Sequence, residues 1–211
     1  MEMAVDQIYE STLRAIETAR RDERYNLLRR LASALTDEVD GEVQPTRGIV
    51  RSRVLYELHM AAFQQATKST GRQARALLRS SMSLANKSAL EADTAGDRLG
   101  VLHTEMNASG LILPAMGQWR EALEMSIRTS EEAEKIAVAS DTSDADRTRA
   151  FRVAANCYIH RGRIIVKQKL DPMELAHLRE KIDANPVYQD QFRKLESIKA
   201  DIASFDAYLH L

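Results

Sequence analysis

The stretch that decides the fold is Gly110-Leu-Ile-Leu-Pro-Ala-Met-Gly117-Gln-Trp119-Arg-Glu-Ala122, near the middle of the 211 residues. Apolar residues recur three and four positions apart on both sides of it, the spacing of one helix face. Pro114 lacks the amide hydrogen that a helix interior needs, and Gly117 permits the backbone angles of a tight turn. The stretch therefore predicts one helix that ends near Leu113 and another that begins at Trp119. The second helix is expected to bury Trp119, Ala122, Leu123, Ile127, Ala133 and Ile136.

The same helix–turn–helix plan recurs along the chain. Gly71, Gly117 and Gly162 are 46 and 45 residues apart, and each follows one helical segment and precedes another. Glu23 takes the place of the glycine in the first pair. Gly162 either turns the chain or lies inside a longer helix that ends before Asp171-Pro172. In the first pair, one face of the second helix carries Leu28, Leu31, Ala32 and Leu35.

Around the central turn the residues resemble the tetratricopeptide repeat. In that family a small residue lets paired helices approach, a glycine closes the turn, and an aromatic residue and an alanine start the second helix. Gly110, Gly117, Trp119 and Ala122 stand in these places, and Ala155, Tyr158 and Gly162 repeat the first half of the pattern. The resemblance implies an all-α fold in which antiparallel helix-turn-helix units stack as a short right-handed solenoid with a C-terminal capping helix.

Three features depart from the family pattern. The units are about 45 residues long, whereas the family unit has about 34. Gln64 stands where the small residue would be in the second unit, and Lys167 replaces the packing alanine in the fourth. The resemblance is good over about residues 95–140 and loose elsewhere, so a generic antiparallel helical bundle is the alternative.

Composition favours a single all-helical domain over residues 1–211, with four helix-turn-helix units over about 3–170 and C-terminal helices over 171–211. The chain has only 8 glycines and 4 prolines, and its one cysteine, Cys157, excludes an intramolecular disulfide framework. A formal charge of −1 gives no electrostatic reason to expect a nucleic-acid or membrane partner. The acidic N-terminus is unlike a signal peptide, and no apolar run approaches the roughly 18 residues of a membrane span. We therefore expect a cytoplasmic protein.

Polar side chains on the first helix of each pair are the candidate binding residues. The resemblance implies a concave face lined by these helices, which holds a segment of another protein. In the clamp version of the family, basic and amide side chains one turn apart grip a terminal carboxylate. Placed by the turn position, the candidates are Arg149, Arg152, Asn156, Asn107, Gln65 and Lys68.

The C-terminal segment carries a regular apolar stripe. It consists of Tyr188, Phe192, Leu195, Ile198, Ile202, Phe205 and Leu209. A seven-residue recurrence of this kind predicts a helix with one buried side. That helix caps the exposed end of the last unit, or forms a self-association seam in a homodimer, or lies in the concave groove until a partner displaces it.

No catalytic or metal motif accompanies these patterns. No histidine pair has metal-ligand spacing, no phosphate-binding loop or nucleophile elbow is present, and Cys157 lies in an apolar helix stripe. We therefore predict a non-enzymatic interaction module, an adaptor or scaffold, without metal or cofactor. One alternative is a structural subunit that homo-oligomerises through its C-terminal helix. Another is an enzyme or ligand sensor with a pocket at which His103, Glu105 and His160 converge.

Overall fold

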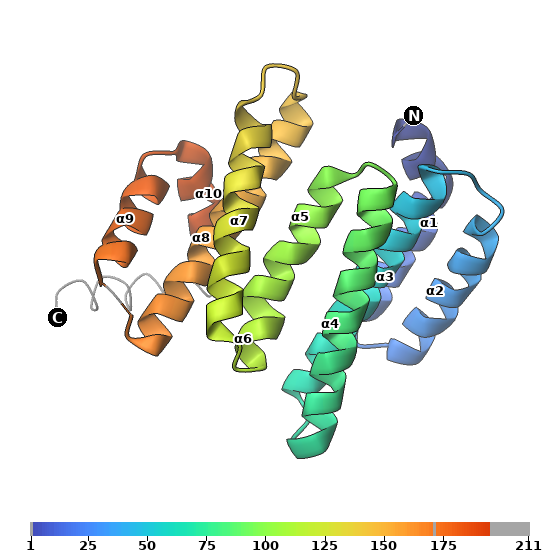
Figure 1. Ribbon diagram of the computed structural model, residues 1–211. Helices are drawn as coiled ribbons and strands as arrows, with labels where there is room; N and C mark the ends of the chain where they lie inside the picture. The colour runs from blue at the N-terminus through green and yellow to red at the C-terminus, as the bar shows by residue number, and fades with distance from the viewer. Residues whose placement is uncertain (1, 171, 195–211) are drawn as a thin grey trace. The chain divides into compact units, whose positions relative to one another are not determined.

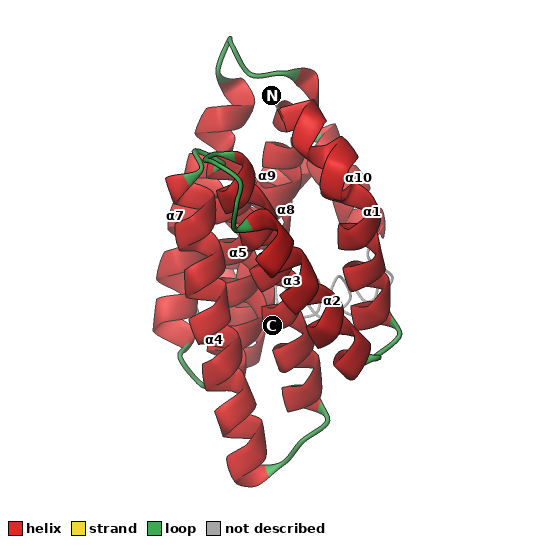
Figure 2. Ribbon diagram, turned by 90° about the vertical axis from the view of Figure 1, so that its right-hand side faces the viewer, coloured by secondary structure: helices red, strands yellow, loops and turns green. Residues whose placement is uncertain are grey.

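The computed structural model describes the backbone of residues 2–170 and 172–194, and the side chains of residues 9–170 and 173–190. Within these ranges the chain is all-α, with short loops between helices and no strand (Figures 1 and 2). The elements are α1 (Glu2–Arg21), α2 (Tyr25–Val39), α3 (Thr46–Thr67), α4 (Gly71–Thr94), α5 (Arg98–Asn107), the π-helix η1 (Ala108–Ile112), α6 (Leu113–Ala115), α7 (Trp119–Val138), α8 (Asp144–Gln168), α9 (Pro172–Asp183) and α10 (Pro186–Lys194). The all-α part of the predicted fold is confirmed.

Neighbouring helices pack as antiparallel pairs, such as α1 with α2, α3 with α4 and α7 with α8. Left-handed backbone angles mark the turns between paired segments: φ is 59° at Glu23, 58° at Gly71 and 79° at Gly117. These are three of the four turn positions that the sequence predicts. A non-glycine residue rarely adopts such a φ, so Glu23 is an uncommon occupant of its place.

The turn expected at Gly162 is wrong, and the longer helix is confirmed. Gly162 is buried inside α8, and Ile164 and Ile165 beyond it are only 3% and 0% exposed, so the helix continues to bury apolar surface past the glycine. Its left-handed C-terminal residue is Lys169, with φ 52°. The last turn therefore falls seven residues, about two helical turns, after the place that the repeat predicts.

Pro114 disturbs the end of its helix, as expected, and the structure shows how. The amide of Leu113 bonds to the carbonyl oxygen of Ala108, five residues back, which defines the wider π-helical turn of η1. In a regular helix the proline ring would collide with the carbonyl four residues earlier. Here the wider π-helical turn lies directly before the proline, and the chain stays helical up to Ala115.

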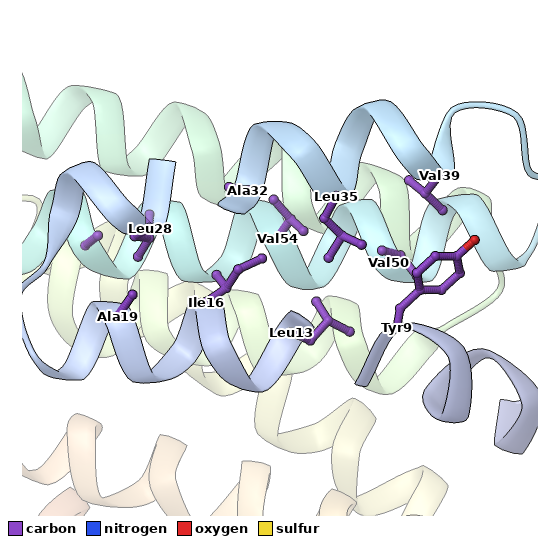
Figure 3. Packing of buried hydrophobic residues seen from close by; sticks show 11 residues of the cluster. Tyr9, Leu13, Ile16, Ala19, Leu28, Ala32, Leu35, Val39, Val50 and Val54 are labelled. Carbon is purple, nitrogen blue, oxygen red and sulfur yellow. The ribbon is translucent and has the colours of Figure 1, made fainter. Parts of the chain in front are cut away.

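The chain divides into two compact units, Met1–Thr104 and Glu105–Leu211. In the first unit α1, α2 and α3 enclose an apolar core in which side chains from all three helices point toward one another (Figure 3). Its members are Tyr9, Leu13, Ile16, Ala19, Leu28, Ala32, Leu35, Val39, Val50, Val54 and Ala61. Each fully buried leucine or isoleucine contributes about 1.5–3 kcal/mol of transfer free energy, so this cluster stabilises the unit.

Small residues make the contact between α3 and α4. The buried positions of α4 are Ser81, Ala85, Ser88 and Ala92. Two of these hydroxyls bond to the backbone of α3: Ser88 Oγ donates to the Ser52 carbonyl and Ser81 Oγ to the His59 carbonyl, each at 2.8 Å. Short side chains let the two helices approach closely, and each hydroxyl finds an acceptor despite its burial.

The second unit uses the same device between α7 and α8. Ser126 Oγ donates to the Cys157 carbonyl at 3.0 Å, and Thr129 and Ser130 are buried beside it. Of the residues expected to be buried on α7, Ala122 and Ala133 are, whereas Ile127 is 36% exposed, so its assignment is wrong. The helix turns its small residues, not its largest apolar ones, toward its partner.

Candidate functional site

A row of polar side chains lies on one face of α8. Ser143 caps the helix, since its hydroxyl accepts a hydrogen bond from the amide of Asp146 at 3.1 Å. Arg149 and Arg152 are exposed and Asn156 is half-buried. Spacings of three and four residues put all three on one face. We call Arg149, Arg152 and Asn156 the α8 row.

The side of α8 opposite the α8 row is buried, which fixes the orientation of the helix. Ala150, Ala154 and Cys157, on the other side of the helix, are 0% exposed. Arg149 forms an ion pair with Asp146 one turn earlier, with 3.4 Å between Nη1 and Oδ1. Arg152, in contrast, has no ion pair within the described ranges, so its guanidinium is available to a carboxylate.

The same face of α8 is covered further along. The ring of His160 packs against Gly110 of η1, and the ammonium group of Lys167 lies 5.1 Å from the ring centre of Trp119. Lys167 thus makes a cation–π contact where the family pattern has a packing alanine. Gly110 was expected to let α7 approach its paired helix, but its closest approach is to α8. The open part of this face is therefore the α8 row.

The other predicted binding residues lie in different surroundings. Asn107 is only 7% exposed, so a partner on the surface would reach little of it. Lys68 is bonded to Glu23 in the turn between α1 and α2. Gln65 lines a hollow of about 480 Å³ beside that turn. Gln65 and Lys68 belong to the first unit, and the α8 row belongs to the second.

Residues of the α1–α2 turn and of the start of α2 complete this hollow, and the sequence patterns did not select them. Arg24 and Arg29 line it together with Tyr25. The Tyr25 hydroxyl is buried and has no hydrogen-bond partner among the described side chains, and burial raises its pKa. These residues lie about 40 positions before Gln65 in the chain. Only the three-dimensional structure shows that they line the same hollow as Gln65.

The first residue of the C-terminal stripe is anchored within its own chain. Tyr188 of α10 is 3% exposed, and its ring lies edge-on against Phe151 and Tyr158 of α8, with centroid separations of 5.7 and 5.5 Å. Its hydroxyl donates to Glu134 Oε1 of α7 at 2.9 Å. Tyr188 is therefore buried against α7 and α8 of its own chain. The side chain of Phe192 and all of Leu195, Ile198, Ile202, Phe205 and Leu209 lie outside the described residues.

Glu134 is the centre of this anchor. Its Oε1 also accepts a hydrogen bond from the Tyr158 hydroxyl at 2.5 Å, and Lys181 of α9 donates to that hydroxyl at 3.3 Å. Burial, followed by the hydrogen bond to the carboxylate, raises the pKa of both Tyr158 and Tyr188. The tyrosines therefore stay protonated as donors, and one carboxylate joins α7, α8, α9 and α10.

Tyr188→Phe is expected to lower the free energy of unfolding by about 1 kcal/mol, because it removes one hydrogen bond and keeps the ring contacts. Denaturant unfolding measures the change. Tyr25→Phe is the matched control: it also deletes a tyrosine hydroxyl, but one without a partner, and should leave stability unchanged or slightly raised. Equal losses in the two variants would contradict a specific role for the Glu134 anchor.

Two of the groups considered for catalysis, Cys157 and Glu105, are engaged within the fold. Cys157 is buried, as predicted, and burial raises the pKa of its thiol to about 12, so the nucleophilic thiolate is disfavoured. Glu105 accepts hydrogen bonds from Arg128 and Thr129, both at 3.0 Å. The described part of the chain contains no group of three or more histidine, cysteine, aspartate or glutamate side chains placed to hold a metal ion.

Comparison with known proteins returns no relative: no protein-family model, no curated protein and no solved structure matches the chain. Among the described residues no helix combines the length and the apolar character needed to cross a membrane. The case for a function therefore depends on the geometry of the chain itself.

Proposed function

We propose that the chain is a non-enzymatic interaction module that holds a segment of another protein. The observation that supports this most directly is the α8 row, in which Arg149, Arg152 and Asn156 present donors on one open face of a 25-residue helix. The proposal includes a tetratricopeptide-like stack of the helix pairs, whose concave face contains this row.

The α8 row suits recognition of a carboxylate. A guanidinium offers several N–H donors in a fixed plane, and an amide one turn away adds a neutral donor and an acceptor. Arg152 and Asn156 are four residues apart and so lie next to each other on the helix surface. A terminal carboxylate of a peptide accepts from both at once, which a single exposed charge does not achieve.

The test compares peptides that end in a free carboxylate with the same peptides amidated at the C-terminus. We expect members of a carboxylate-terminated peptide library to bind the full chain and the amidated forms to bind more weakly. Combining Arg152→Glu with Asn156→Ala should lower the affinity at least tenfold, while helicity and melting temperature stay nearly unchanged, because both residues lie at the surface. Unchanged affinity in this variant would discard the α8 row as the site.

A further inference from the structure

The α3–α4 hairpin contains a long run of sequence without an acidic side chain. Between Leu58 and Leu90 the chain has no aspartate or glutamate, in a protein whose formal net charge is −1. The same run has five cations: Lys68, Arg72, Arg75, Arg79 and Lys87. The rest of the chain has 25 Lys and Arg against 31 Asp and Glu, so the positive run creates a local field, not a global one.

Four of these cations share the exposed face of α4. Positions 72, 75, 79 and 87 fall within about a third of the helix circumference, and all four side chains are exposed. The opposite face, with its buried serines and alanines, packs on α3. The four charges therefore extend along about 22 Å of solvent-facing helix. We call Arg72, Arg75, Arg79 and Lys87 the α4 basic face.

The α4 basic face has no ionic partner within the described ranges. Some exposed arginines elsewhere do have one: Arg14 pairs with Glu10, and Arg21 with Glu17. Like charges three and four residues apart on a helix repel, so Arg75 and its neighbours lower the stability of the isolated helix slightly. A partner that brings carboxylates to this face removes the repulsion and gains charge-assisted hydrogen bonds.

We propose that the α4 basic face is a docking surface for an acidic segment of a partner protein. Three of its four cations are arginines, whose planar guanidinium groups bind carboxylates through two parallel hydrogen bonds. Their spacing of one and two helical turns matches that of glutamates or aspartates on one side of a partner helix. The surface lies in the first unit and is separate from the α8 row.

A protein partner fits this face better than a nucleic acid or a membrane. Residues 71–90 contain no aromatic side chain on which a base could stack, and the chain as a whole is not basic. Membrane-surface helices present an apolar face beside their cations, whereas the buried side of α4 is already packed on α3. The remaining polyanion of suitable chemistry is a stretch of carboxylates.

The probe is a fluorescently labelled, glutamate-rich helical peptide with an amidated C-terminus, titrated with the full chain at low salt and followed by anisotropy. The test variant combines Arg75→Glu with Arg79→Glu. The matched control combines Arg120→Glu with Lys169→Glu, which changes the net charge equally at exposed positions of the second unit. Arg75→Gln with Arg79→Gln serves as a milder variant if the charge reversal impairs folding.

We expect the charge reversal on α4 to lower the peptide affinity at least tenfold and the control less than twofold, with binding that weakens as salt rises. Absence of binding to the wild-type chain would overturn the proposal, as would an equal loss in the variant and the control. Tighter binding of a single-stranded oligonucleotide or of anionic lipid vesicles would overturn the assignment to a protein partner. The probe has no terminal carboxylate, so it lacks the group that the α8 row is proposed to bind.

Discussion

Replacing Gly110 by alanine is expected to lower the free energy of unfolding by about 2 kcal/mol. A Cβ atom at this position would overlap the His160 ring at Cγ, Cδ2 and Nε2. The ring atoms closest to the backbone of α8 are among them, so a simple rotation of a side-chain end does not relieve the overlap. Overpacking of this kind costs about 1–3 kcal/mol, and the better helix propensity of alanine returns about 1 kcal/mol at most.

Two further variants make this prediction specific. Gly41→Ala adds the same methyl group where it meets no atom within 4 Å, and should change stability by about 0.5 kcal/mol or less. In a chain that carries His160→Ala, the Gly110→Ala change should lose most of its effect, because the overlapping ring is absent. Thermal or denaturant unfolding of the wild type, Gly110→Ala, His160→Ala and the double variant gives the coupling energy between the two positions. A neutral Gly110→Ala variant would mean that η1 and α8 do not approach as closely as described.

The prediction from sequence succeeded where large apolar residues recur with helical spacing. Leu28, Ala32 and Leu35, selected on that pattern alone, are buried in the core of the first unit. The turns at Gly71 and Gly117 were also predictable, since glycine adopts a positive φ without a steric penalty. These features depend on local properties of the chain, which a sequence displays directly.

The pattern failed where helices meet through small residues. On α7 it selected Ile127, whereas Ser126, Thr129 and Ser130 occupy the contact with α8 and its neighbours. A serine or threonine is read as a surface residue because its hydroxyl is polar. Burying that hydroxyl costs little free energy once it donates a hydrogen bond to a carbonyl of the adjacent helix. Gly162 left two interpretations open for a related reason. The sequence alone does not distinguish a glycine that lets two helices pack closely from a glycine that turns the chain.

The candidate surfaces, too, were predictable only in part from the sequence. The exposure of Arg149 and Arg152 follows from their place on one side of a predicted helix. The acid-free run that ends at Leu90 is visible in the sequence, but only the packing of α4 on α3 shows that its arginines share an open face without ionic partners. The hollow at Gln65 was not predictable from sequence patterns, because Arg24 precedes α2 and Arg29 lies within it, both far from Gln65 in the chain.

The second prediction with a large expected effect concerns the stability of the folded chain at acidic pH. Lowering the pH from 7 to 5 is expected to remove about 2 kcal/mol of stability through His59 alone. This side chain is 0% exposed, and neither ring nitrogen has a hydrogen-bond partner among the described residues. Burial first, then the nearby charges of His103 and Arg20, lower the pKa of His59 from 6.5 to about 3.

The sign follows from which state binds the proton. Between pH 6.5 and about 3 the unfolded chain protonates this histidine and the folded chain does not, so acid favours unfolding. The contribution of His59 is therefore fully present above pH 6.5 and declines as the pH falls. At pH 5 the difference is 1.5 pH units, or about 2 kcal/mol at 1.36 kcal/mol per unit.

His59→Leu removes the titrating group and keeps a side chain of similar volume beside Tyr56, whose ring is perpendicular to that of His59 with 5.0 Å between the ring centroids. Urea unfolding at pH 7, 6 and 5 should show that the variant loses about 2 kcal/mol less than the wild type over this range. Burial also lowers the pKa of His160, to about 4, so His160 accounts for part of the stability that the His59→Leu variant still loses at acidic pH. The exposed His177→Gln variant is the control and should keep the full loss. If His59→Leu lost stability with acid as steeply as the wild type, the ring must reach a hydrogen-bond partner or solvent, and the packing of α3 around it would need revision.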